Sequence, residues 1–391
     1  MLPKNMITEC PYNPQPKVGK VIVYDSTLRD GEQMPGVAFR HEDKLKIASM
    51  LSEAGVPEIE AGFAAVSQHE LDTIKSITGL GLDAKILSLS RARQSDIDCA
   101  LKAGVDIVLL FAGTSDIHLR YKYGHIVNHE EILAQSVDAV EYAKSHGVKV
   151  SFSCEDGTRT PFDFLLRMYK AVEDAGADRL GITDTLGCIT PEGISKLVRD
   201  VKAKVKRPVS VHLHNDFGLA NANALSAAMA GADAITTTVN GMGERCGNVP
   251  LEQFASSMFF LYGVDLGIDL SHLTEISRQV SQMARYQCSV NHPITGENAF
   301  SHESGIHVAA IMNHPSTYEY IDPEKVGNRR HLRLGKHSGA SYLKKRLADL
   351  GYECTPSQLN LILDDVKSLG EQQGRVDDQE FLSIVKRNLN S

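Results

Sequence analysis

Short apolar runs recur along the chain from residue 20 to about residue 240, and longer stretches with helical spacing separate them. The runs are rich in Val, Ile and Leu, which is typical of buried strands. On this pattern we expect eight strands, at Val21–Tyr24, Glu58–Gly62, Ala84–Leu89, Asp106–Phe111, Val148–Ser153, Arg179–Thr183, Val209–His214 and Ala234–Val239. The alternation of strand and helix indicates an α/β fold with parallel strands.

The stretches between these strands have the features of helices. The segment His41–Ala54, for example, places Leu45, Ala48 and Leu51 at helical spacing. Several stretches end in a glycine, which can adopt the left-handed conformation that stops a helix. These glycines are Gly55, Gly104, Gly147, Gly176 and Gly231. The next expected strand begins within three residues of each, so each helix end leads into a parallel strand.

Eight strand–helix units in about 240 residues match a (β/α)8 TIM barrel, which usually has about 250 residues. A doubly wound sheet usually has fewer strands and a glycine-rich first turn, whereas Thr27–Gln33 carries no dinucleotide fingerprint. We therefore predict an N-terminal arm at 1–19, a catalytic barrel at 20–285, a lid or linker subdomain at 286–345 and a small helical C-terminal subdomain at 346–391. Helices are expected at Gln358–Leu369 and Asp377–Leu389.

The strand at Val209–His214 carries two histidines, His212 and His214, that point to the same side because residues two apart share a face. Followed by Asn215 and Asp216, they predict half of a divalent-metal site. Two core histidines satisfied by hydrogen bonds, or a polar strand end, are the alternatives. His and carboxylate ligands suit Zn, Mn, Fe or Co, and Mg less well. The spacing does not choose between Asp25 and Asp30 as the carboxylate.

Further polar residues follow other strands, and active sites of this fold lie at the carboxyl ends of the strands. They are Arg29, Asp30 and Gln33; Ser153, Glu155 and Asp156; Asp184 and Thr185; and the loop Asn240–Asn248. Arg29 could stabilise a developing alkoxide or simply pair with a neighbouring Asp. Glu155 could be a general base, an orienting group or a helix N-cap. The glycine-rich loop could contact phosphates or a thioester through backbone N–H groups.

Composition narrows the class of protein. The net charge of −8 provides no positive field for nucleic acid, and no apolar run is long enough to span a membrane. The seven Cys show no paired short spacing, which argues against a disulfide framework and suits a reducing cytosol. The first residues do not form a signal peptide. We expect a cytoplasmic enzyme that acts on small molecules, with no nucleic-acid or membrane partner.

Several motifs resemble those of the 2-isopropylmalate/homocitrate synthase family. The blocks are Leu28–Gln33 with Lys44, His212–Gly218 with Ala220 and Ala222, Gly241–Asn248, Phe300–His307 and Leu334–Gly339. They extend from about Val21 to Gly339, so the resemblance covers most of the chain. The family uses a (β/α)8 barrel to condense an acyl-CoA, usually acetyl-CoA, with a 2-oxo acid, and then hydrolyses the thioester.

The resemblance implies roles for individual residues. Asp30 rather than Asp25 would be the metal carboxylate, together with His212 and His214, with Asn248 close by. The ion would be one divalent metal, Mn, Zn, Mg, Co or Fe, and the 2-oxo acid would chelate it through its keto and carboxylate oxygens. The expected catalytic residues are Arg29, which polarises the keto group, Glu155, which positions substrate and acid/base groups, and His302.

The remaining implied roles concern the two substrates and the partner subunit. The 2-oxo acid would contact Gln33, Ser153, Thr185 and Arg120. Acetyl-CoA would contact Gly241, Gly243, Glu244, Arg245 and Gly247. His302 would come from the partner subunit of a homodimer, within the lid subdomain, and help to form the acetyl-CoA enolate. A loop histidine without a role is its alternative.

Local features point to a short homocitrate synthase, a transferase of amino-acid biosynthesis and carboxylic acid metabolism that uses 2-oxoglutarate. The long 2-isopropylmalate synthases carry a further C-terminal domain, and we expect none here. Segments 113–120 with Gly124-His125, 179–188 and 313–320 resemble homocitrate synthases.

Three departures from the family pattern bear on the substrate. Asp30 replaces a Glu of the lysine-pathway enzymes, Leu109 replaces a His of many isopropylmalate-type relatives, and Ser151 replaces an Arg that grips a distal carboxylate. Either Arg120, Lys122 or His118 takes over that last task, or the substrate has no distal carboxylate. The alternatives are therefore 2-isopropylmalate or citramalate synthesis and, in other classes, a metal-dependent aldolase or lyase or a non-catalytic paralogue.

Overall fold

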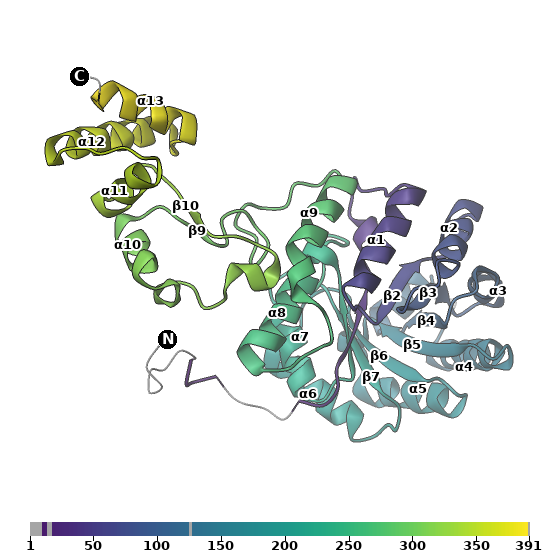
Figure 1. The fold of residues 1–391 in the computed structure, drawn as a ribbon. Helices are drawn as coiled ribbons and strands as arrows, with labels where there is room; N and C mark the ends of the chain where they lie inside the picture. Colours follow the sequence, from purple (N-terminus) through teal and green to yellow (C-terminus); the bar gives the residue numbers. More distant parts are fainter. Residues whose placement is uncertain (1–9, 14–17, 125–126, 390–391) are drawn as a thin grey trace. The chain divides into compact units, whose positions relative to one another are not determined.

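The structure is a computed structural model that describes residues 10–13, 18–124 and 127–389. Most of the predicted N-terminal arm, and His125, lie outside the described residues. The chain forms two compact units, Asn13–Cys288 and a second one that contains Ser289–Ser391 (Figure 1).

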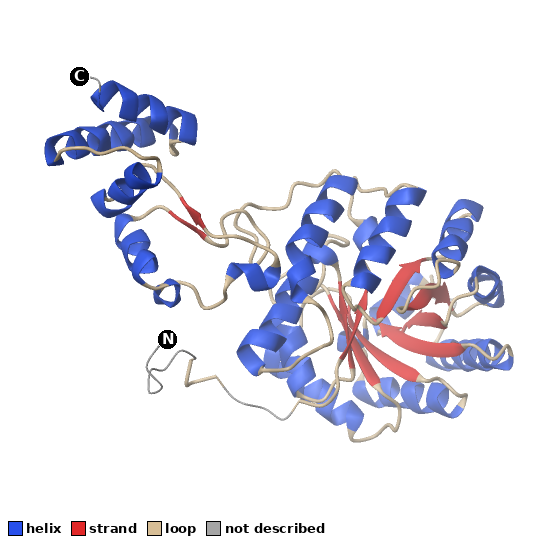
Figure 2. Ribbon diagram, viewed as in Figure 1, coloured by secondary structure: helices blue, strands red, loops and turns tan. Residues whose placement is uncertain are grey.

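The first unit is a closed barrel of eight parallel strands in sequential order, in which β1 pairs with both β2 and β8 (Figure 2). The strands are β1 Ile22–Asp25, β2 Glu58–Gly62, β3 Lys85–Arg91, β4 Ile107–Gly113, β5 Lys149–Glu155, β6 Arg179–Asp184, β7 Val209–Leu213 and β8 Ala234–Thr237. The predicted TIM barrel is confirmed, and the expected strand limits are within two residues of these.

Helices surround the strands and cover the outside of the barrel (Figure 2). They are α1 His41–Glu53, α2 Gln68–Thr78, α3 Gln94–Ala103, α4 His129–Ser145, α5 Phe162–Asp174, α6 Pro191–Lys202, α7 Ala220–Met229, α8 Leu251–Tyr262 and α9 Leu273–Met283. Short turns are η1 Gly31–Gln33, the π-helical turn η2 His118–Lys122, η3 Gly157–Arg159, η4 Val239–Gly241 and η5 Leu270–His272. Each long helix buries one apolar stripe; in α1, Ile47 and Leu51 are fully buried.

A buried charged group fills part of the barrel interior. Arg179, at the start of β6, forms an ion pair of 2.7 Å with Glu58 of β2. Its Nε donates to the hydroxyl of Ser151 at 3.2 Å, and its guanidinium carbon lies 5.0 Å from the ring centroid of Tyr24. Arg179 thus has partners at Nη1 and Nε, which offset part of the cost of burying its charge, whereas its Nη2 is buried without a hydrogen-bond partner.

The second unit is mostly helical, with α10 Gly305–Asn313, α11 Ala340–Asp349, α12 Pro356–Gln373 and α13 Asp378–Leu389. Two short strands pair in parallel, β9 Ser301–His302 and β10 His331–Leu332, and the turns η6 Pro315–Thr317 and η7 Pro323–Val326 complete it. One apolar core contains Val308, Leu343, Ile362 and Phe381 and so draws residues from both sides of residue 345. The helices predicted at Gln358–Leu369 and Asp377–Leu389 are present, whereas α10 was not predicted.

None of the helices in the described part of the chain is long and apolar enough to cross a membrane. The prediction that five glycines terminate helices in the left-handed region is confirmed, because all five have φ between 75° and 104°. Gly55 is the most constrained of them. A Cβ at Gly55 would lie 2.3 Å from the backbone oxygen of Gly267, whereas a Cβ at Gly147 would meet no atom within 4 Å.

We therefore predict that Gly55→Ala destabilises the protein more than Gly147→Ala. Both variants introduce left-handed strain of about 1 kcal/mol. Gly55→Ala adds a backbone clash, so its total cost is about 2–4 kcal/mol. Equilibrium unfolding of both variants in urea measures the difference, and equal destabilisation would contradict the close approach at Gly55.

Candidate active site

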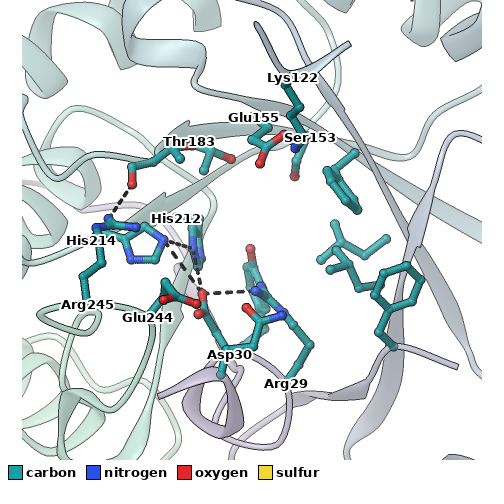
Figure 3. Close-up of a pocket in the computed structure, with 17 residues that line it drawn as sticks. Arg29, Asp30, Lys122, Ser153, Glu155, Thr183, His212, His214, Glu244 and Arg245 are labelled. Carbon is teal, nitrogen blue, oxygen red and sulfur yellow. Dashed lines mark hydrogen bonds and ion pairs between the residues drawn. The ribbon is translucent and has the colours of Figure 1, made fainter. Parts of the chain in front are cut away.

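A cavity of about 330 Å³ opens at the carboxyl ends of the barrel strands (Figure 3). All eight strands, or the loops after them, contribute to its wall. The lining residues are Tyr24, Arg29, Asp30, Gln33, Phe63, Leu89, Leu109, Phe111, Lys122, Ser153, Glu155, Thr183, Thr185, His212, His214, Glu244 and Arg245. Most of the polar strand ends predicted from the sequence therefore come together at one place, although Asp156 and Asp184 are not among the lining residues.

Asp30, His212 and His214 form one compact buried group, and their ligand atoms lie within 4.8 Å of one another. Oδ2 of Asp30 lies 3.1 Å from Nε2 of His212 and 4.0 Å from Nε2 of His214. The two Nε2 atoms are 3.3 Å apart. Asp25, the competing carboxylate, is not part of this group, because it accepts hydrogen bonds from the backbone N–H of Thr27 and, at 3.3 Å, from Oγ1 of Thr237.

The donor set of this group fits a divalent metal. Two imidazole nitrogens and carboxylate oxygens are ligands for Zn, Mn, Fe or Co. Asn248 pairs with His214 in an isolated β-bridge, and its Nδ2 donates to the backbone oxygen of Met242 at 3.2 Å. Within the described part of the chain, the carboxylate oxygens of Asp30, Oδ1 of Asn248 and Nδ1 of His214 are buried without a hydrogen-bond partner. Such groups are expected where an ion or water completes the site.

The charges of the group favour metal binding at neutral pH. Burial alone raises the pKa of Asp30, but Arg29, His212 and His214 outweigh it and hold that pKa well below its ordinary value. Burial, and then the neighbouring His212, lowers the pKa of His214 to about 4. Asp30 is therefore a carboxylate and His214 a neutral imidazole, which are the forms that ligate metals.

Glu60 of β2 fixes Arg29 against the candidate metal ligand Asp30. Its Nε donates to Oε1 of Glu60 at 2.7 Å and its Nη2 to Oε2 at 3.0 Å, while Nη1 lies 3.1 Å from Asp30. Ser26 donates a further hydrogen bond of 2.5 Å to Glu60. The ion pair with a neighbouring Asp therefore exists, and Arg29 also lines the pocket. Glu60 was not predicted, because it lies inside a strand that reads as buried.

A second group of charges lies across the pocket (Figure 3). Glu155 forms an ion pair with Lys122, and Nδ1 of His118 lies 3.6 Å from its carboxylate. Burial raises the pKa of Glu155, but His118 and Lys122 together bring it below its ordinary value, so it is a carboxylate at neutral pH. The residue at the N-cap of α5 is Pro161, so Glu155 does not cap that helix.

The loop after β8 folds back on itself. A Cβ at Gly247 would lie 1.8 Å from the backbone oxygen of Gly241, so only glycine fits there. The N–H of Asn248 donates to that same oxygen at 3.0 Å. Arg245 is held by Asp216, with bonds of 2.8 and 2.9 Å, and by the backbone oxygen of Thr185 at 2.6 Å. The loop therefore brings Arg245 and Asn248 to the pocket and the metal-binding group.

Six of the predicted site residues are not among those that line this pocket: Arg120, His302, Asn248, Gly241, Gly243 and Gly247. Arg120 is exposed, and its guanidinium carbon lies 5.3 Å from the ring centroid of Tyr121. His302 belongs to the second unit, where its Nε2 lies 3.1 Å from Oε1 of Glu319. Gln33, Ser153 and Thr185 do line the pocket. Lys122 also lines the pocket, whereas the sequence analysis assigned the contact with the 2-oxo acid to the nearby Arg120.

Two family models match this chain, one in each of the two units. The HMGL-like family matches residues 20–280, and the domain described as homocitrate synthase post-HMGL domain-like matches residues 294–374. The barrel resembles the HMG-CoA lyase of Bacillus subtilis with a TM-score of 0.62 at 19% identity, over 71% of this chain and 96% of that one. The chain belongs to the HMGL-like family.

Relatives with closely similar sequences have more specific names. The homocitrate synthase AksA of Methanopyrus kandleri is 48% identical over 95% of this chain and 93% of its own length. A probable 2-isopropylmalate synthase of Ignicoccus hospitalis is 48% identical over 95% and 92%. The (R)-citramalate synthase CimA of Methanocaldococcus jannaschii is 46% identical over 94% of this chain and 74% of its own length. The predicted resemblance to the 2-isopropylmalate/homocitrate synthase family is thus confirmed.

We predict that His212→Ala abolishes metal binding, because it removes one of the three grouped ligands. Metal content after loading with Mn²⁺ and desalting, measured by mass spectrometry, should fall from about one ion per chain to near zero, with a 10–100-fold loss of affinity as the minimum. The exposed His146 provides the control, and His146→Ala should keep the metal. Full metal content in the His212 variant would rule out the proposed ligand set.

Proposed function

We propose that this protein is an acyltransferase of the homocitrate synthase type, which converts acetyl-CoA and 2-oxoglutarate to homocitrate and CoA. Three relatives named homocitrate synthase AksA are 44–48% identical over at least 94% of the chain. The observation that carries the proposal is the buried Asp30, His212 and His214 group beside Arg29 in the pocket. We place the enzyme in the cytoplasm, because its composition is that of a soluble protein.

The metal would be held by Asp30, His212 and His214, with Asn248 next to them; Mn, Zn, Mg, Co and Fe are the candidate ions. When bound, a divalent ion acts as a Lewis acid that polarises the carbonyl of the 2-oxo acid. Arg29 places its positive charge where negative charge develops on the keto oxygen. Glu60 fixes the direction of that guanidinium, so no reorganisation is needed during the reaction.

Other residues bind the two substrates in this proposal. Ser153, Thr185 and Gln33 offer hydrogen bonds to the carboxylate next to the keto group, and Glu155 helps to position the substrate and the acid/base groups. The loop Gly241–Gly247 presents its backbone, with Glu244 and Arg245, to acetyl-CoA. These side chains lie on the pocket wall or, for the glycines, in the loop that forms it.

His302 is the proposed base that takes a proton from the methyl group of acetyl-CoA. Glu319 lies behind it at 3.1 Å and is itself bound to Arg330. A carboxylate beside one ring nitrogen orients the imidazole, which suits a general base. His302 would act in the barrel of a partner subunit, so the proposal includes a homodimer with the 286–345 segment as its exchanged lid.

A second candidate function has its own support in the pocket. Phe63, Leu89, Leu109 and Phe111 form an apolar part of the wall, which would suit the branched side chain of 2-oxoisovalerate. Relatives named 2-isopropylmalate and citramalate synthase are as similar as those named homocitrate synthase. The remaining alternative is a metal-dependent lyase. It is supported only by the likeness in fold between this barrel and the HMG-CoA lyases.

The central prediction is that the purified protein with Mn²⁺ or Zn²⁺ releases CoA from acetyl-CoA when 2-oxoglutarate is present. Free thiol measures the release, and a panel with 2-oxoisovalerate and pyruvate separates the three synthases. Release with 2-oxoisovalerate alone would overturn the homocitrate assignment, and no release with any acid would overturn the condensation.

A separate prediction concerns His302→Ala. The variant should keep its metal, because His302 is not one of the grouped ligands, and should lose turnover by about 100-fold or more, as removal of a general base does. Exchange of the acetyl-CoA methyl protons with D₂O, followed by NMR, should be lost in parallel. Exchange at the wild-type rate in this variant would show that another group is the base, whereas loss of metal would place His302 in the metal site.

A further inference from the structure

We propose that Lys122 selects the acceptor acid by binding a carboxylate at the end of the 2-oxo acid that is distant from the keto group. This inference rests on the proposed function, because it names the part of the same pocket that reads the acceptor. The sequence left this task open between Arg120, Lys122 and His118, since Ser151 stands where a cation was expected. Arg120 is exposed and outside the pocket lining, which removes it from the choice.

Three residues that line the pocket carry a permanent positive charge, Arg29, Lys122 and Arg245. Arg29 is already bound to Glu60 through two hydrogen bonds and to Asp30. Arg245 is bound to Asp216 and to a backbone oxygen. Each guanidinium is therefore held in one orientation by protein groups through its Nε and Nη2 atoms.

Lys122 differs from both arginines in its partners and exposure. Its ammonium group has three protons and pairs with the single carboxylate of Glu155, and its side chain keeps 40% of its exposed surface. It also lies 5.5 Å from the ring centroid of Phe111. The ammonium group can therefore donate to an incoming carboxylate while it remains paired with Glu155.

The backbone around Lys122 is held in place. The N–H of Gly113, at the end of β4, donates to the Tyr123 hydroxyl at 3.0 Å, and the N–H of His118 donates to the Ser115 hydroxyl at 3.2 Å. These bonds anchor the π-helical turn η2 at its first residue and at the residue that follows Lys122. A fixed backbone reduces the conformational entropy that the lysine loses when it binds a ligand.

Lys122 lies on the side of the pocket opposite the candidate metal ligands. In Figure 3, Lys122, Glu155 and Ser153 lie across the pocket from Asp30 and Arg29. The apolar wall includes Leu109 and Phe111 of β4, the strand that leads into η2. A 2-oxo acid held at the metal-binding group would place its methylene groups against apolar side chains and its distal carboxylate at Lys122. His118 instead faces Glu155 and Asp156.

The test compares Lys122→Met with wild type on two acceptors. For 2-oxoglutarate, kcat/KM should fall by about 10–100-fold, mostly through KM, because one charged hydrogen bond is lost. For 2-oxoisovalerate, which has no distal carboxylate, kcat/KM should stay within about twofold. Lys122→Arg should restore most of the loss. Lys196→Met, which removes an exposed lysine paired with Asp200 on α6, is the matched control and should behave as wild type.

Equal losses on both acids would mean that Lys122 only holds Glu155 in place, and that outcome overturns the proposal. An unchanged value for 2-oxoglutarate would overturn it as well. Calorimetric binding of 2-oxoglutarate to the Mn²⁺-loaded protein, without acetyl-CoA, keeps the test independent of turnover. If the wild-type protein releases no CoA with any acid, the proposed function fails. The binding measurement still tests the role of Lys122 in that case. An affinity of Lys122→Met for 2-oxoglutarate that is about 10-fold lower supports that role, and an affinity equal to that of wild type refutes it.

Discussion

The buried ion pair between Arg29 and Glu60 organises the mouth of the barrel. It joins the turn after β1 to the interior of β2, and the same guanidinium reaches Asp30. Removal of Glu60 would leave a buried cation with one partner fewer, which costs several kcal/mol in typical proteins. The direction of Arg29, the first of the neighbours that lower the pKa of Asp30, therefore depends on a residue that no motif contains.

The two histidines of the candidate metal site could be predicted from the sequence because their signal is local, whereas the choice of Asp30 over Asp25 came from the family resemblance. A His-x-His pair at the end of an apolar strand fixes two ligands on one face, and the barrel topology brings Asp30 to them from β1. Glu60 gave no such signal, since its partner is 31 positions away and its neighbours are apolar. The choice of Lys122 over Arg120 depends on the π-helical turn, whose side-chain directions are not encoded in a simple periodicity.

The same contrast applies to the fold. The eight strands and the left-handed glycines follow repeated patterns, so they could be predicted almost to the residue. The helix α10 could not, because it lies in a segment rich in Gly, His, Pro and Asn, and tertiary packing rather than helix propensity stabilises it. Its Val308 enters a core built mainly by α11, α12 and α13.

The pair of Arg179 with Glu58 fixes how deep the pocket can be. Arg179 contacts Ser151 and lies against Tyr24, which forms part of the pocket wall. A longer acceptor therefore cannot extend along the barrel axis without displacing a buried charge. It must extend sideways, towards β4 and the loop after it. Acceptor length can then diverge between related enzymes through changes in one surface loop, while the closure of the barrel stays untouched.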